Sequence, residues 1–135
     1  MNLYDNDDGF KVFTLAQVNA ILPQVIVRTE RAVELLEIAR KHHESGDAVD
    51  SEGARDDFDK RSGKILEDWS REIALLGAYP KGYFTVDFKS PIPETLFCWT
   101  LGEDRIRHTH KTHETFKDRI RIIDELTLGF EDSLN

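Results

Sequence analysis

The hydrophobic pattern of the chain begins with apolar residues at helical spacing. Thr14, followed three residues later by Gln17, has the spacing of a capping box. Phe13 and Val18 fall at the two positions of a hydrophobic staple around the same start. These local signals predict a helix from Thr14, and apolar residues continue along it at helical spacing. The apolar positions that follow are Val25, Ala32, Leu35, Leu36 and Ala39.

Pro23 interrupts this first helical pattern. It lies about two turns into the helix, where proline lacks the backbone donor and crowds the preceding turn. The sequence therefore predicts either a kink at Pro23, or a short helix 14–21 followed by a second helix that begins at Pro23. We expect the helix to fade near Lys41, His42 and His43.

A second helix is predicted from Glu52 to Leu76. Gly77 lies just past its last apolar residue, where helices commonly end. The apolar stripe of this helix consists of Phe58, Ile65, Leu66, Trp69, Ile73 and Leu76, with Trp69 expected in the core. Residues 44–51 are polar and turn-rich, which predicts a loop. A short connection between two long helices predicts an antiparallel hairpin.

The pattern then changes to that of a small antiparallel β-unit. Residues 83–88 are aromatic and β-branched, as in a strand. Residues 95–101 and 105–110 are predicted as two strands joined through 102–104, whereas 116–123 is ambiguous between strand and helix. The expected fold is α+β, a long helical hairpin followed by the β-unit. We expect one domain over 13–123, with a flexible leader at 1–12 and an acidic tail at 124–135.

Two strand registers are open around Cys98, and a shift of one residue exchanges the faces. With a three-residue loop at 102–104, Cys98 lies opposite His108, and His110 shares their face. With Arg105 in the loop, Phe97, Trp99, Leu101 and Ile106 share one face with both histidines, and Cys98 turns away. The second register gathers the apolar residues better, so burial favours it.

Composition and charge restrict the functions that the chain can have. Its 135 residues are 39% hydrophobic and 33% charged, with a net charge of −8. Because an acidic surface repels phosphate, we expect no nucleic-acid partner. The single cysteine, Cys98, forms no internal disulfide, which is typical of a reducing compartment. Without a signal peptide or an apolar run of roughly 18 residues, a cytoplasmic protein with no membrane association is expected.

Histidines concentrate in the last predicted strand of the hairpin. His108 and His110 point to the same side of a strand and are candidate ligands of a divalent transition metal such as zinc or copper. Cys98 adds a sulfur ligand in the first register, whereas His113 must fold back to contribute. The alternative is a polar strand end with solvated imidazoles.

Four further residues are candidates for a ligand-binding site together with His110. Asp87 lies mid-strand among aromatic residues, so it either points outward or is buried and paired. Glu103 is either a solvated turn residue or faces Arg119 or a histidine. Arg119 is either a surface ion-pair residue or a bidentate clamp for an anion. Trp99 is the fourth candidate, and its support is the family resemblance described in the next paragraph.

Several motifs resemble an uncharacterised bacterial family, domain of unknown function 2203. Residues 13–23 are similar to its opening pattern FT-x-x-x-x-N-x-x-LP, and residues 98–103 to its Cys-Trp-x-x-Gly-Glu segment. Leu76-Gly77, Val86-Asp87-Phe88, His110 and Phe116-x-x-Arg119 follow in the family's order, so the similarity covers about 13–120. The chain has Thr109 and Thr115 where the family typically has tryptophan and glycine. The resemblance implies the α+β fold and the candidate site without implying a reaction.

These observations predict an interaction or regulatory module rather than an enzyme. The long hairpin and the acidic surface favour a homodimer or another protein bound to the helices. One alternative is a metal- or small-anion-binding protein with its site on the β-unit. A third hypothesis is an enzyme that uses Asp87, Glu103 or His110 as acid or base, or a Cys98–His108 nucleophile.

Overall fold

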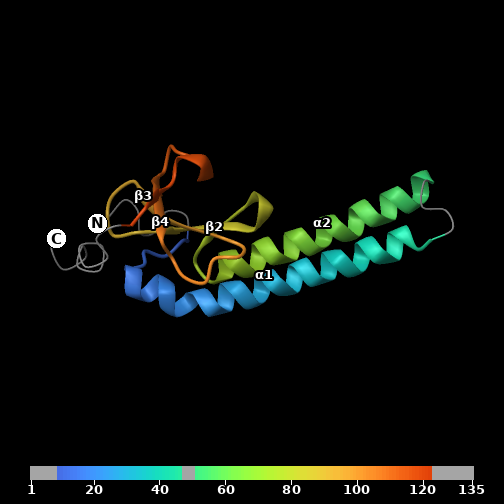
Figure 1. Cartoon of the computed structure of the whole chain (residues 1–135), viewed down its shortest axis with the longest axis horizontal. Coiled ribbons are helices and arrows are strands. Elements are labelled where there is room, and N and C mark those ends of the chain that lie inside the picture. The colour runs from blue at the N-terminus through green and yellow to red at the C-terminus, as the bar shows by residue number, and fades with distance from the viewer. Residues whose placement is uncertain (1–8, 47–50, 123–135) are drawn as a thin grey trace.

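The computed structural model describes residues 9–46 and 51–122, and it has two layers. The helices α1 (Leu15–Glu44) and α2 (Glu52–Leu75) form the predicted hairpin, and a sheet lies across one end of it (Figure 1). The strands are β1 (Tyr79–Lys81), β2 (Thr85–Lys89), β3 (Thr95–Thr100), β4 (His108–Lys111) and β5 (Ile120–Arg121). Each strand is antiparallel to its neighbours in the order β1-β2-β3-β4-β5. The predicted α+β class is confirmed.

The start of α1 follows the predicted capping box. The Thr14 hydroxyl accepts a bond from the Gln17 N–H at 3.1 Å, and the Gln17 side chain accepts one from the Thr14 N–H at 2.9 Å. The helix then continues through Pro23 without a break, so the alternative of two separate helices is wrong, and the kink stays a prediction. Asn19, one turn before Pro23, accepts a bond from the Ile106 N–H at 2.9 Å and thereby anchors the β3–β4 loop to α1.

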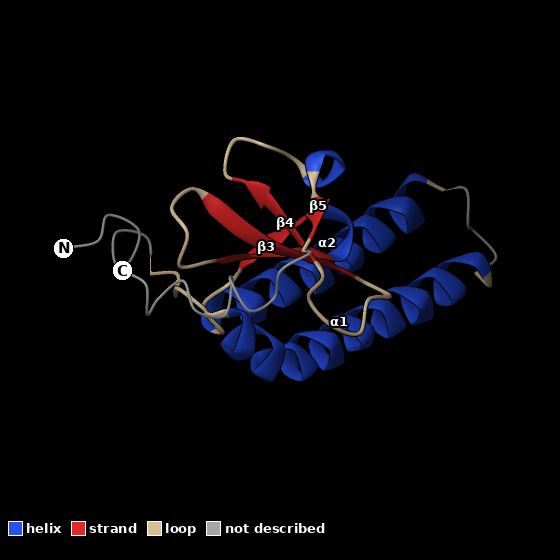
Figure 2. Ribbon diagram, turned by 60° about the vertical axis from the view of Figure 1, so that its left-hand side comes forward, coloured by secondary structure: helices blue, strands red, loops and turns tan. Residues whose placement is uncertain are grey.

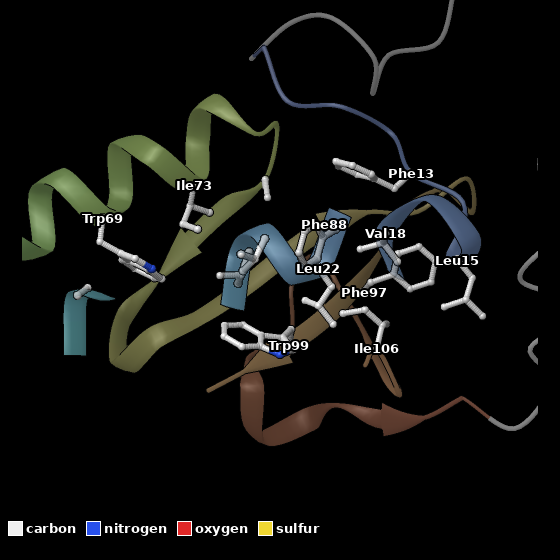
Figure 3. Packing of buried hydrophobic residues seen from close by; sticks show 14 residues of the cluster. Phe13, Leu15, Val18, Leu22, Trp69, Ile73, Phe88, Phe97, Trp99 and Ile106 are labelled. Atoms are coloured by element: carbon white, nitrogen blue, oxygen red, sulfur yellow. The ribbon is translucent and has the colours of Figure 1, made fainter. Parts of the chain in front are cut away.

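The core lies between the hairpin and one face of the sheet. Phe88, Phe97 and Trp99 point from β2 and β3 towards α1, where Leu22 meets them (Figure 3). Alternate residues of a strand face opposite sides. The side chains of β2, β3 and β4 that alternate with these core residues therefore lie on the other face of the sheet, which the helices do not cover.

Beyond the sheet, the hairpin loses its cover, as Figure 2 shows. Leu35 and Leu66 belong to the predicted apolar stripes but are 40% and 42% exposed, because only the other helix lies beside them at this end. Trp69 is buried as predicted, and its indole N–H donates to the Thr29 hydroxyl at 2.8 Å. Neither described helix is long and apolar enough to cross a bilayer.

Two predicted strand boundaries are wrong. The strand expected from Tyr83 begins at Thr85, because residues 82–84 form a 3₁₀ turn in which Phe84 has a φ of 58°, outside the extended region. The strand expected from Arg105 begins at His108, because 101–107 form a loop. The ambiguous segment becomes the 3₁₀ turn Phe116–Asp118 followed by β5.

The chain before α1 is joined to the sheet. The Lys11 N–H donates to the carbonyl of Gly77 at 3.0 Å, and Val12 forms a parallel bridge with Lys89. Gly77 follows α2 with a φ of 96°, as predicted for the residue after a helix end. The segments 1–8 and 123–135, which hold most of the expected leader and tail, lie outside the described residues.

Candidate functional site

The face of the sheet away from the helices carries the candidate residues, because of the register of its central strands. Asp87 pairs with Cys98 across β2 and β3, and Cys98 pairs with His108 across β3 and β4. The register favoured from burial is therefore wrong. The Cys98–His108 pairing of the alternative is right, although residues 101–107 form a longer loop than the three residues expected. Ile106 does reach the core, but from the loop, so its burial does not fix the face of His108.

Asp87 and His110 form a buried pair near the centre of this face. The Nε2 atom of His110 lies 3.0 Å from an Oδ of Asp87, and each side chain is only 4% exposed. The other ring nitrogen, Nδ1, lies 2.8 Å from the carbonyl of Lys111 and must carry a proton to bond with it. Nε2 is therefore directed at Asp87, and one further proton is shared between the imidazole and the carboxylate. Of the two possibilities for Asp87, the buried and paired one is confirmed.

Cys98 lies beside this pair and is fully buried. Burial, together with the nearby Asp87 charge, raises the pKa of the Cys98 thiol to about 12. Both nitrogens of His110 already face oxygen atoms, so the imidazole has no free position from which to accept the thiol proton. The arrangement therefore does not build the activated cysteine–histidine nucleophile that acyl transfer requires.

Glu103 and Arg119 form a second charged pair near Cys98. Two nitrogens of the Arg119 guanidinium donate to the two carboxylate oxygens of Glu103, at 3.0 and 2.8 Å. The Thr100 N–H also donates to Glu103 at 2.9 Å, and His108 Nδ1 lies 3.5 Å from the carboxylate. One Arg119 nitrogen lies 4.0 Å from the Cys98 sulfur. The expected contact of Glu103 with Arg119 and a histidine is present, and Arg119 is held by a carboxylate of its own chain.

A cavity of about 700 Å³ opens on the same face of the sheet. Asp87 and His110 line it from the sheet together with Leu96, and Phe116 lines it from the segment between β4 and β5. The hydroxyls of Thr85 and Thr100, which also line it, are 3.0 Å apart. This volume is within the range of small-molecule sites, which are commonly about 300–1,000 Å³.

The remaining candidates lie apart from the buried group. His108 is on the same face but contacts Glu103, and His113 is exposed beyond the end of β4. Trp99 is fully buried on the opposite face, where its indole N–H donates to the Glu103 carbonyl at 2.8 Å. Trp99 therefore supports the loop that carries Glu103 instead of lining the cavity.

Asp87, Cys98 and His110 are the group in the described part of the chain that has the composition of a metal site. Each offers one ligand atom, the three atoms lie within 4.8 Å of one another, and all three residues are buried. Sequence reasoning placed Cys98 and His110 among the metal candidates but left Asp87 out. The acid in the middle of an aromatic strand was the signal that would have included it.

Comparison with protein families shows which family the chain belongs to. A family model described as "Uncharacterized conserved protein (DUF2203)" matches residues 11–122. The chain belongs to the DUF2203 family. No curated protein and no solved structure matches it. The family motifs now have structural places. The opening Phe-Thr motif caps α1, the Asp, Cys-Trp and His positions lie on β2, β3 and β4, the Glu position lies in the β3–β4 loop, and the Arg position lies just before β5.

The Glu103–Arg119 pair is expected to make the stability of this DUF2203 chain sensitive to acid. Partial burial raises the pKa of Glu103, but the bonds from Arg119 and Thr100 and the Arg119 charge outweigh it, so the pKa is lowered from 4.5. A carboxyl group whose pKa is lower in the folded than in the unfolded protein stabilises the fold at pH values above its unfolded-state pKa. This stabilisation is lost as the pH falls through the folded-state pKa. Glu103→Gln is expected to cost about 1–3 kcal/mol at pH 7 and clearly less near pH 3.

Urea unfolding at both pH values measures this difference. Asp104→Asn is the matched control, because Asp104 also pairs with an arginine but its side chain is 81% exposed. An exposed pair contributes at most about 1 kcal/mol, so the control is expected to change little. If Glu103→Gln costs the same free energy of unfolding at pH 7 and pH 3, the lowered pKa of Glu103 in the folded protein would be contradicted.

Proposed function

We propose that this chain binds a divalent transition metal, with Zn²⁺ as the first candidate, through Asp87, Cys98 and His110. The observation that supports this proposal is the approach of three different ligand atoms to within 4.8 Å in a buried site. Zinc takes sulfur, imidazole nitrogen and carboxylate oxygen as ligands. Three protein ligands with a fourth position open to water or substrate are typical of catalytic zinc sites.

The spacing of the ligand atoms is close to what an ion requires. Tetrahedral Zn²⁺, with bonds of about 2.0–2.3 Å, holds its ligand atoms roughly 3.3–3.8 Å apart. The largest separation here is at most 4.8 Å, so it has to shrink by at most about 1 Å on binding, whereas the 3.0 Å between His110 Nε2 and the Asp87 carboxylate has to widen slightly. We expect rotations of the Cys98 and Asp87 side chains to supply this movement.

Charge balance also favours a divalent ion. The site without metal is neutral when one proton is shared by Asp87 and His110 and the Cys98 thiol keeps its own. The deprotonated ligand set carries two negative charges, one on the carboxylate and one on the thiolate. A divalent cation therefore replaces two protons and leaves the buried site neutral, which avoids the large cost of a buried net charge.

The residues around the three ligands resemble the outer shell of metal sites. A metal-binding histidine usually donates its second N–H to a carbonyl or carboxylate, as His110 does to Lys111. Arg119 lies 4.0 Å from the Cys98 sulfur, where its charge favours the thiolate, and Glu103 holds Arg119 in that position. These contacts give Glu103 and Arg119 a supporting role.

Metal binding has stronger support than the other functions expected from the sequence. An anion clamp requires a free guanidinium, and Arg119 already donates two bonds to Glu103. The interaction module rests on exposed apolar residues of the hairpin such as Leu35 and Ile38, which specify no partner. The three converging ligands specify a ligand class.

Elemental analysis of protein expressed without a histidine tag tests the proposal. The wild-type chain is expected to retain about one Zn²⁺ per chain after dialysis, as one site of three ligands implies. Cys98→Ser and His110→Gln are expected to retain almost none. In the Co²⁺-substituted protein, thiolate-to-metal charge-transfer absorption is expected for the wild type and should vanish in Cys98→Ser.

Two matched histidine variants separate this site from adventitious binding. His113→Gln and His108→Gln remove imidazoles that lie outside the buried group, so both are expected to retain the metal. A wild-type stoichiometry near zero would make the Asp87–His110 pair a structural ion pair only. Equal metal loss in His113→Gln and His110→Gln would show that the ion binds elsewhere.

A further inference from the structure

We infer that the cavity beside the proposed metal centre binds a small carboxylic acid with an apolar body, whose carboxylate occupies the open coordination position. This inference rests on the proposed metal site. Asp87 and His110, two of the three proposed ligands, line the cavity, whereas Cys98 does not, so we expect the open position of the ion to lie on the side of Asp87 and His110. A volume of about 700 Å³ is far larger than one water molecule needs.

The charges at the cavity favour an anionic head group. The site with Zn²⁺ is neutral, so a bound carboxylate adds one negative charge to its surroundings. Lys81 and Lys117 line the cavity and offset that charge. Glu114 also lines the cavity, but one of its carboxylate oxygens already accepts a hydrogen bond of 2.7 Å from the Lys111 N–H.

The walls of the cavity favour an apolar body behind that head group. Leu96 is buried in the wall, and Phe116 is 43% exposed although its ring lines the cavity. Phe116 packs over the Arg119 guanidinium, 4.2 Å from its ring centroid, which leaves the ring available to a ligand on its other side. An alkyl or aromatic chain in the cavity removes this apolar surface from water.

Hexanoate, acetate and 1-hexanol separate the contributions of head group and body. Calorimetric titration of the Zn²⁺-loaded protein is expected to show hexanoate binding at least tenfold tighter than acetate, since each buried methylene contributes up to about fourfold. Hexanoate is also expected to bind at least tenfold tighter than 1-hexanol, and tighter to the loaded than to the metal-free protein. Equal binding of hexanoate and acetate, or of hexanoate and the alcohol, would overturn the inference.

Variants of the cavity wall place the ligand. Phe116→Ala is expected to weaken hexanoate several-fold and leave acetate unchanged, whereas Ile120→Ala, 67% exposed and outside the cavity lining, is expected to change neither. The double variant Lys81→Gln with Lys117→Gln is expected to weaken hexanoate and leave 1-hexanol unchanged. If Phe116→Ala and the double lysine variant both bind hexanoate as tightly as the wild type, the acid binds elsewhere and the inference is overturned.

Metal content separates the two possible failures. A wild-type chain that takes up no Zn²⁺ overturns the metal centre and, with it, the carboxylate site. A chain that takes up one Zn²⁺ but binds neither hexanoate nor acetate overturns the carboxylate site alone.

Discussion

Raising the pH by one unit near neutrality is expected to tighten Zn²⁺ binding by up to about 100-fold, because binding displaces the Cys98 thiol proton and the proton between His110 and Asp87, and each contributes up to about tenfold. Such a dependence is steeper than that of a site made of carboxylates alone, which are already ionised at neutral pH. The prediction follows from the atoms of the site, and each of the two protons has a separate origin.

The first proton belongs to the Cys98 thiol. Its pKa is raised to about 12, first by burial and then by the Asp87 charge, so the group is protonated throughout the neutral range. The second proton lies between His110 and Asp87, since the Nδ1 proton of the ring is already directed at the Lys111 carbonyl. An ion that binds Sγ, Nε2 and a carboxylate oxygen displaces both. Because protons compete with the metal, affinity falls as the pH falls.

Competition with a chelator of known Zn²⁺ affinity, across several pH values, measures the slope. Titration in two buffers that differ in ionisation enthalpy counts the protons directly. Asp87→Asn is the control, because an amide oxygen cannot share the proton, and this variant is expected to bind more weakly and release about one proton. A wild-type chain that releases one proton or none would contradict the proposed ligand set.

Local sequence signals predicted the helices well, and the reason lies in the distance over which each signal acts. The Thr14 cap is formed by Gln17, only three residues away, so the sequence contains both partners side by side. The helix end before Gly77 is marked by the residue itself, because its φ of 96° is one that glycine adopts readily. The start of β2 was placed too early because Phe84 adopts a positive φ while its ring packs edge-on against Trp69 of α2, 5.0 Å away. That contact joins two elements of the fold, so local sequence signals do not contain it.

The register around Cys98 shows why the site was only partly predictable. Burial correctly assigned Phe97, Trp99 and Ile106 to the core, but Leu101, which was grouped with them, is 38% exposed. The error came from treating Ile106 and His108 as residues of one strand, although Ile106 lies in a loop that resets the alternation. Gly102, with a φ of 104°, and the polar residues after it were the signal for a longer loop.

The contacts of the site join residues that are distant in the chain. Asp87 and His110 are 23 positions apart and meet only because β2, β3 and β4 are aligned as they are. Their residue types mark them as candidates, but their pairing requires the register. The cavity is less predictable still, since part of its wall is the irregular segment that contains Phe116.

Trp99→Ala is expected to destabilise the fold by about 3–5 kcal/mol, the usual cost of removing a fully buried large aromatic side chain. Trp99 is 0% exposed, and its ring packs with the core beneath the site while its N–H bonds to the Glu103 carbonyl at 2.8 Å. The substitution therefore leaves a cavity under β3 and an unpaired carbonyl in the loop. Urea unfolding followed by far-ultraviolet circular dichroism measures the loss. Leu75→Ala, at a side chain 78% exposed, is expected to stay within about 0.5 kcal/mol.

Trp99→Phe separates the packing of the ring from its hydrogen bond. It keeps most of the buried volume but leaves the Glu103 carbonyl without its donor, which is expected to cost about 1–3 kcal/mol. Because Glu103 holds Arg119 against Cys98, the variant is also expected to lower Zn²⁺ affinity about 10–100-fold, as losses in the outer shell of a metal site do. A folded Trp99→Phe protein with unchanged metal affinity would show that the loop and the three ligands are held independently. A coupled loss would show that the aromatic core under the sheet sets the geometry of the site above it.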